Sequence, residues 1–99
     1  MYKLKLLEEA DKEFEEAAAW YEEKSSGLGV RFIETVRSKL EDIREHPERN
    51  TKRKGNFREA VVRIFPYLIV NIFYKNNGAI LVSSIFHTSR NPKRKYRRK

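Results

Sequence analysis

The segment YLIVNIFYKNNGAILVSSIFHT, at residues 67–88, contains two runs of strand-forming residues with a turn between them. Valine, isoleucine, tyrosine and phenylalanine are frequent in both runs, residues 67–75 and 79–88, and these residue types favour β-strands. Asn76, Asn77 and Gly78 separate the runs, and Asn-Gly favours a hairpin because both residues tolerate a positive φ. The segment therefore predicts an antiparallel hairpin.

The turn also predicts a register for this hairpin. With Asn77 and Gly78 as the central turn residues, the expected facing pairs are Tyr74 with Leu81, Val70 with Ile85, Leu68 with His87 and, on the opposite side, Asn71 with Ser84. The same register places Tyr67, Phe73 and Phe86 on one face of the sheet, where we expect them to be core residues. A slip of one residue would exchange the two faces.

Outward from the hairpin, the sequence predicts one more strand before it and a strand and two helices at the N-terminal end. Residues 57–64 form a strand-like run that ends near Pro66, and residues 2–7 alternate apolar and basic side chains. Residues 8–24 and 28–45 each carry an apolar stripe at helical spacing. The expected stripes are Ala10, Phe14, Ala17 and Tyr21, with Trp20 at the margin, and Ile33, Val36, Leu40 and Ile43.

A glycine-containing break at residues 25–29 joins the two helices, and His46-Pro47 ends the second helix, because a residue before proline avoids helical geometry. The predicted order is therefore β-α-α-β-β-β, which is an α+β fold with a helical hairpin packed on a mainly antiparallel sheet. We expect a single domain over residues 1–90. Residues 91–99 are expected to form a basic C-terminal tail that is disordered until it meets a partner.

Charge is unevenly distributed along the 99 residues, whose net charge is +8. Residues 1–48 contain 8 Lys and Arg residues against 13 Asp and Glu residues, whereas residues 49–99 contain 14 basic residues and one acid, Glu59. A basic half of this strength attracts nucleic acid, a ribosome or an acidic protein, or it serves only to keep the chain soluble.

Several classes of function find no support in the composition. The sequence has no cysteine, which excludes disulfides and thiolate metal sites and suits a reducing cytoplasm. It has neither a signal-peptide pattern nor a run of about 20 apolar residues, so we expect no membrane association. It also lacks a metal-ligand cluster, a glycine-rich phosphate loop and a nucleotide-binding signature, so we expect neither a metal nor a cofactor.

The order of elements and several short motifs together resemble the RelE/ParE toxins. The motifs are Trp20-Tyr21-Glu22, Gly27-Leu28-Gly29-Val30-Arg31-Phe32, Arg63-Ile64-Phe65-Pro66-Tyr67 and the ending His87…Arg90-Asn91-Pro92. The resemblance covers almost the whole chain. It implies a cytoplasmic toxin of a bacterial type II toxin–antitoxin pair, which inhibits growth and forms a hetero-oligomer with a cognate antitoxin that neutralises it.

The resemblance implies different targets for the two branches of the superfamily. RelE-like toxins cut messenger RNA on the ribosome without a metal ion, whereas ParE-like toxins inhibit DNA gyrase. Arg90 and Tyr96 have the spacing of the late arginine and tyrosine of the nucleases, and together with the basic charge they favour RNA binding and cleavage. Leu68 stands where these nucleases usually carry an arginine. A gyrase inhibitor without catalysis, or an inactive antitoxin-binding module, is therefore the alternative.

For the nuclease hypothesis, the candidate catalytic residues are Arg58, His87, Arg90 and Tyr96. An imidazole can act as an acid or a base near neutral pH, so His87 is either an acid–base group or a strand-end residue packed on Leu68. Arg90 either contacts a phosphate or lies exposed, and Tyr96 either stacks on a base or is a disordered aromatic. The candidate target-binding residues are Lys52, Arg53, Lys54, Arg63, Lys93, Arg94 and Lys95. The same charges are expected of a solvated surface.

Overall fold

The computed structural model describes residues 2–96 and confirms the predicted α+β fold. The helices and strands are β1 (Lys3–Leu6), α1 (Glu8–Lys24), α2 (Leu28–Glu45), β2 (Lys52–Lys54), β3 (Phe57–Val61), β4 (Tyr67–Tyr74), β5 (Ala79–His87) and the short 3₁₀ helix η1 (Pro92–Arg94). The strands form one sheet in the order β1-β5-β4-β3-β2. β1 is parallel to β5 and the other neighbours are antiparallel.

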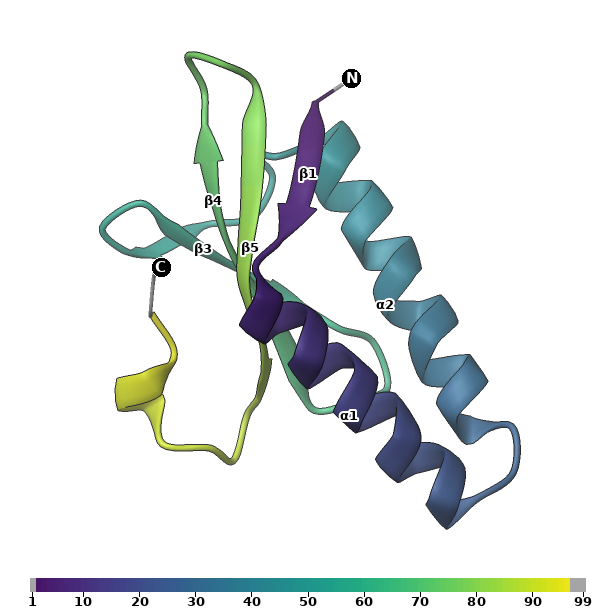
Figure 1. Ribbon diagram of the computed structural model, residues 1–99. Helices are drawn as coiled ribbons and strands as arrows, with labels where there is room; N and C mark the ends of the chain where they lie inside the picture. The colour runs from purple at the N-terminus through teal and green to yellow at the C-terminus, as the bar shows by residue number, and fades with distance from the viewer. Residues whose placement is uncertain (1, 97–99) are drawn as a thin grey trace.

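Both helices lie on one side of the sheet, and the C-terminal segment lies on the other (Figure 1). The fold therefore has three layers over part of the sheet. Among the described residues, no helix is long and apolar enough to cross a membrane. The sequence does not predict the strand β2, because the run of lysine and arginine at residues 52–54 carries no strand pattern.

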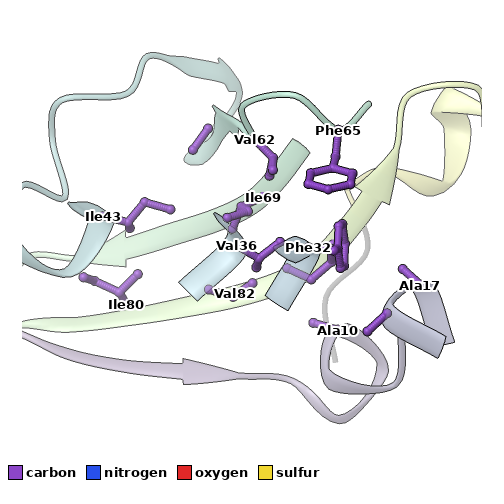
Figure 2. Close-up of a cluster of buried hydrophobic side chains, with 13 residues drawn as sticks. Ala10, Ala17, Phe32, Val36, Ile43, Val62, Phe65, Ile69, Ile80 and Val82 are labelled. Atoms are coloured by element: carbon purple, nitrogen blue, oxygen red, sulfur yellow. The ribbon is translucent and has the colours of Figure 1, made fainter. Parts of the chain in front are cut away.

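The core between helices and sheet is built around Phe32, which is fully buried. Its ring contacts those of Tyr21 and Phe65 with centroid separations of 5.1 and 5.0 Å, and Figure 2 shows Phe32 and Phe65 beside one another. Each predicted stripe residue of α1 and α2 lies in or against this cluster. Trp20, at the margin of the α1 stripe, contributes little to this core, since 54% of it is exposed.

The predicted register of the β4–β5 hairpin is wrong. Tyr74 pairs with Ala79 and Leu68 with Phe86. The turn has four residues instead of two, and only its Gly78 adopts a positive φ (67°). A register shift then occurs between Val70 and Asn71, where β5 carries one extra residue. The observed pairs are Tyr67–His87, Leu68–Phe86, Ile69–Ile85, Val70–Ser84, Asn71–Val82, Ile72–Leu81, Phe73–Ile80 and Tyr74–Ala79.

The new register moves Phe86 to the face of the sheet that is turned away from the helices. There it forms a second buried cluster with Phe57, Val70 and Ile72. Tyr67 and Phe73 pack on the helix side as expected. The face on which Phe86 lies could not be predicted from the sequence, because a bulge leaves no recognisable signal in a run of apolar residues.

The predicted strand of residues 57–64 also ends early, at Val61. Ile64 has a φ of 76°, a left-handed conformation that is rare for a β-branched residue, and it lies in the loop before Pro66. Arg63 is therefore a loop residue.

A carboxylate at the end of α1 fixes the connection between the helices. Glu22 accepts hydrogen bonds from the backbone N–H groups of Gly27 (2.8 Å) and Gly29 (2.9 Å), which lie at the start of α2. These bonds satisfy donors that a helix leaves unpaired at its N-terminus. They lower the pKa of Glu22 below its ordinary 4.5, with the bond from Gly27 as the largest cause.

Because this pKa is lower in the folded state, the contribution of Glu22 to stability is present above pH 4.5 and is lost as the pH falls through the folded value. We expect Glu22→Gln to reduce the acid sensitivity of unfolding below pH 4.5, which urea titrations at several pH values measure. Glu23→Gln is the matched control and should leave the pH dependence unchanged. Equal acid sensitivity of wild type and Glu22→Gln would contradict this role.

Candidate functional site

A hollow of about 310 Å³ lies between α1 and the end of β5. We call it the α1–β5 pocket, and it is lined by Glu13, Glu16, Ala17, Trp20, Tyr21, Tyr67, Ile85, His87 and Arg90. α1 supplies the first five residues. Tyr67 begins β4, Ile85 and His87 end β5, and Arg90 follows in the next turn. The pocket thus forms where β5 extends beyond the end of its neighbour β1.

Glu13 is the polar centre of this pocket. One carboxylate oxygen accepts hydrogen bonds from Ser84 Oγ (2.9 Å) and from the backbone N–H of Ile85 (3.0 Å). The other oxygen pairs with Arg90 Nη1 at 2.6 Å. β1 ends opposite Val82, so Glu13 pairs a backbone donor of β5 beyond that point. It also holds Arg90 against α1.

His87 packs edge-on against the ring of Tyr67, with centroids 5.0 Å apart, and not against Leu68 as the predicted register implies. Its Nδ1 accepts a hydrogen bond from the backbone N–H of Ser89 (3.0 Å) and lies 2.8 Å from Ser89 Oγ. A neutral ring in this arrangement carries its proton on Nε2. Burial raises the pKa of Tyr67 above its ordinary 10.0, so Tyr67 stays protonated at neutral pH.

Tyr96 lies on the other face of the sheet. Residues 91–96 do not extend away from the domain as a disordered tail. They turn back over the sheet (Figure 1), and the ring of Tyr96 packs on Phe57 with centroids 5.3 Å apart. The hydroxyl of Tyr96 donates a short hydrogen bond to the carboxylate of Glu59, which also pairs with Lys95 Nζ at 3.2 Å. Glu59, the one acid of the basic half, therefore holds the C-terminal segment in place.

The environment of Tyr96 raises its pKa to about 12. Burial is the largest cause, the hydrogen bond to Glu59 and its charge add to it, and the charge of Arg53 opposes it. A phenol with this pKa holds its proton firmly at neutral pH. It is a poor general base, since efficient proton transfer needs a pKa near the working pH.

Arg58 is buried on the helix side of the sheet. Its guanidinium donates to the backbone carbonyls of Asn50 (2.6 Å) and Glu48 (3.5 Å), and its Nε has no hydrogen-bond partner among the described residues. Arg58 thus ties the loop after α2 to β3. It is separated from Tyr96 by the sheet.

We expect Arg58→Met to lower the free energy of unfolding by about 2 kcal/mol, because a hydrogen bond to a charged group contributes roughly 1.5–3 kcal/mol. Growth inhibition per folded molecule should not change. Urea denaturation and a toxicity assay measure the two effects. Arg37→Met removes an exposed guanidinium from α2 and is the control. If Arg58→Met is folded but not toxic, Arg58 takes part in function and this prediction is wrong.

The basic candidates lie in three places. Lys54, Lys93 and the ring of Tyr96 line one hollow, and Lys54 Nζ lies 5.9 Å from that ring. The structure thus brings the exposed strand β2 next to the C-terminal segment. Arg63 lies elsewhere, in a hollow with Thr35 and Asp42 of α2. The first group comprises Lys52, Arg53, Lys54, Lys93 and Lys95, whereas Arg94 lines a hollow beside α1 with Glu16 and Arg90.

The four candidate catalytic residues therefore occupy three places. His87 and Arg90 share the α1–β5 pocket, Tyr96 lies on the opposite face, and Arg58 lies under the loop after α2. Arg90 also lies near the opposite face, since its guanidinium carbon is 5.5 Å from the ring centroid of Phe86, in the cluster against which Tyr96 packs. Among residues 2–96, no group of three or more His, Cys, Asp and Glu side chains could hold a metal ion.

The acidic residues that line the pocket and hold the C-terminal segment are not among the predicted site residues. Glu13 and Glu16 look like any solvated acid of an acidic helix, and nothing in the sequence indicates that they line a pocket. Glu59 gives a usable signal, because it is the single acid among the last 51 residues. A lone acid on a basic strand is a reasonable candidate for pairing with the basic tail.

Comparison with known proteins agrees with the fold. A structure of a chromosomal ParDE toxin–antitoxin system from P. aeruginosa is similar over 90% of this chain and 98% of that chain, with a TM-score of 0.74 and 12% identity. The intact E. coli RelBE toxin–antitoxin complex matches over 91% and 100%, with a TM-score of 0.67 and 24% identity. The isolated E. coli RelE toxin matches over 92% and 88%, with a TM-score of 0.65 and 24% identity. At these identities the likeness concerns the fold.

A comparison with curated protein sequences gave no match. The model of one protein family, described as the ParE toxin of the type II toxin–antitoxin system parDE, matches residues 4–92. This range runs from β1 to η1 and includes the α1–β5 pocket. The chain therefore belongs to the ParE toxin family of type II toxin–antitoxin systems and has the RelE/ParE fold.

Proposed function

We propose that this toxin inhibits growth by binding its target without performing chemistry, and that the target is DNA gyrase. The observation that carries the proposal is the separation of Arg58, His87, Arg90 and Tyr96. This conclusion reverses the preference for mRNA cleavage that charge and spacing give at the level of sequence.

Cleavage of RNA without a metal needs a base for the 2′-hydroxyl, an acid for the leaving oxygen and cations beside the reacting phosphate, all within hydrogen-bond reach. The candidate residues do not supply this arrangement. Tyr96 is hydrogen-bonded to Glu59 and has a pKa of about 12, and Arg90 is paired with Glu13. Arg58 is committed to backbone carbonyls.

The side chains on the sheet face beneath Tyr96 also disfavour catalysis. Phe57, Val70, Ile72 and Phe86 are buried there, and Leu68 packs against them. An apolar surface does not stabilise the negative charge that develops on a phosphate during cleavage. The resemblance to ParE-like toxins implies gyrase as the target, and the match to the ParE family model supports that branch.

The proposal includes a cognate antitoxin. Two of the similar structures are toxin–antitoxin systems, ParDE and RelBE, and the basic second half of this chain suits an acidic partner. The two proteins would form a cytoplasmic hetero-oligomer. An antitoxin that binds only the folded toxin stabilises it by mass action. We therefore expect a higher melting temperature for the complex than for the free toxin, and equal values would contradict specific binding.

A ribosome-dependent nuclease is the second candidate. It is favoured by the basic group around Tyr96, in which Lys54 and Lys93 line one hollow with that ring. Such a surface attracts phosphate backbones and offers an aromatic ring for stacking. In this candidate, residues 91–96 would have to move on the ribosome, because Glu59 holds the hydroxyl of Tyr96.

Two reactions with purified toxin test the proposal. DNA gyrase supercoils a relaxed plasmid with and without toxin, and a translation reaction with the same toxin is analysed by primer extension for cuts in the message. We expect inhibition of supercoiling and an intact message. Cuts that require ribosomes, together with normal supercoiling, would establish the nuclease. If neither reaction responds while the toxin binds its antitoxin, the chain is an inactive antitoxin-binding module.

A further inference from the structure

We propose that the α1–β5 pocket binds the side chain of an arginine presented by a partner protein. The pocket combines an aromatic wall with a carboxylate of the acidic helix α1 that has no partner among residues 2–96. This inference is independent of the target proposed above, because it concerns the chemistry of one pocket. Failure of gyrase inhibition would leave it standing.

The aromatic wall consists of four rings, from Trp20 to His87, that are joined by three consecutive ring contacts. Trp20 meets Tyr21 edge-on with centroids 5.1 Å apart, Tyr21 meets Tyr67 at 6.4 Å, and Tyr67 meets His87 at 5.0 Å. Electron-rich ring faces attract cations, and tryptophan does so most strongly. The ring of Trp20 already attracts one cation, because Lys24 Nζ lies 5.0 Å from its centroid.

Glu16 supplies the negative charge that would pair with the guanidinium of the arginine. Glu13 is occupied by Ser84, Ile85 and Arg90, so that the Glu13–Arg90 pair adds little net charge to the pocket. Glu16 lies in the next turn of α1 and lines the same pocket. Among the described residues it has no hydrogen-bond or ion-pair partner. α1 carries eight acidic residues against two lysines, which favours an incoming cation. Lys12, Arg90 and Arg94 line a neighbouring hollow with Glu16 and offset part of this charge.

Arginine fits this pocket better than lysine. Its planar guanidinium stacks on aromatic faces while its edge donates two parallel hydrogen bonds to a carboxylate. The apolar stem of the side chain can lie along Ala17 and Ile85, which also line the pocket. A volume of about 310 Å³ accommodates one such side chain.

The only tryptophan of the chain, Trp20, reports directly on this site. We would titrate the toxin with the capped peptide Ala-Arg-Ala and follow the tryptophan fluorescence and the indole N–H signal in NMR spectra. The uncharged isostere Ala-citrulline-Ala has nearly the same shape without the charge. We expect saturable binding of the arginine peptide and affinities for the citrulline peptide that are lower by about two- to fivefold or more.

Matched variants separate the pocket from the general charge of the helix. Glu16→Gln should weaken binding of the arginine peptide by about two- to fivefold, whereas Glu23→Gln, which removes an equal charge elsewhere on α1, should not change it. Circular dichroism checks that both variants are folded. Equal affinity for the arginine and citrulline peptides, stronger binding of Ala-Glu-Ala, or no saturable response from Trp20 would each overturn the proposal.

Discussion

Phe32→Ala is expected to lower the free energy of unfolding by about 4 kcal/mol, since truncation of a buried phenylalanine typically costs about 3–5 kcal/mol. Phe32 is fully buried, and its ring contacts those of Phe14, Tyr21, Phe65 and Tyr67. These residues come from α1, β4 and the loop before it, so the cavity would lie where the helices meet the sheet.

The loss is large relative to the whole molecule, because domains of this size have a total stability of about 5–15 kcal/mol. Urea denaturation followed by circular dichroism measures it. Val30→Ala is the control, since Val30 lies on the same helix and is 54% exposed, and it should change stability by less than about 0.5 kcal/mol. A Phe32→Ala protein within 1 kcal/mol of wild type, on the order of an ordinary surface change, would show that the helices do not pack as described.

Gly29→Ala is the second large effect that we expect. A Cβ atom at Gly29 would lie 2.5 Å from the backbone oxygen of Ala18 and 2.8 Å from Cβ of Glu22. The oxygen belongs to a helix and cannot rotate away. Overpacking of this kind costs about 1–3 kcal/mol and occasionally more. Alanine is otherwise the better helix former by up to about 1 kcal/mol, so we expect a net loss of about 1–2 kcal/mol.

The same change should move α1 away from α2 and alter the fluorescence of Trp20, which lies near the end of α1. Gly27→Ala is an instructive comparison. Gly27 has a φ of 88° with open space around a Cβ, so its cost of about 1–2 kcal/mol comes from backbone strain and not from a clash. Gly29→Ala with wild-type stability and unchanged fluorescence would contradict the close approach of the two helices.

These glycines also illustrate how far the sequence predicts the fold. Residues 25–29 indicate the break between two helices, and the apolar stripes of α1 and α2 identify the buried faces, because helical periodicity is a local property. The sequence does not show that Gly29 is required by contact with Ala18, since that contact arises only when the helices pack. The order of elements is therefore predictable, whereas close approaches are not.

The candidate site is less predictable than the fold for a related reason. The sequence places His87 and Arg90 near the end of a strand, and they do share a pocket. It does not predict their partner Glu13, which is 77 residues away from Arg90. The position of Tyr96 depends on its hydrogen bond to Glu59 and on an apolar cluster that includes Phe86 because of the bulge near Val70. Such long-range pairings need the assembled sheet.

The central claim is that this toxin inhibits by binding and not by catalysis, and the Tyr96→Phe variant tests it most directly. Phenylalanine keeps the ring that packs on Phe57 but removes the hydroxyl that donates to Glu59. We would express wild type and variant from an inducible promoter without antitoxin and measure growth inhibition per amount of folded protein. We expect equal inhibition within about twofold. Loss of a catalytic proton-transfer group lowers the rate by about 10²–10⁴-fold, and a comparable loss of toxicity in a folded variant would contradict the account.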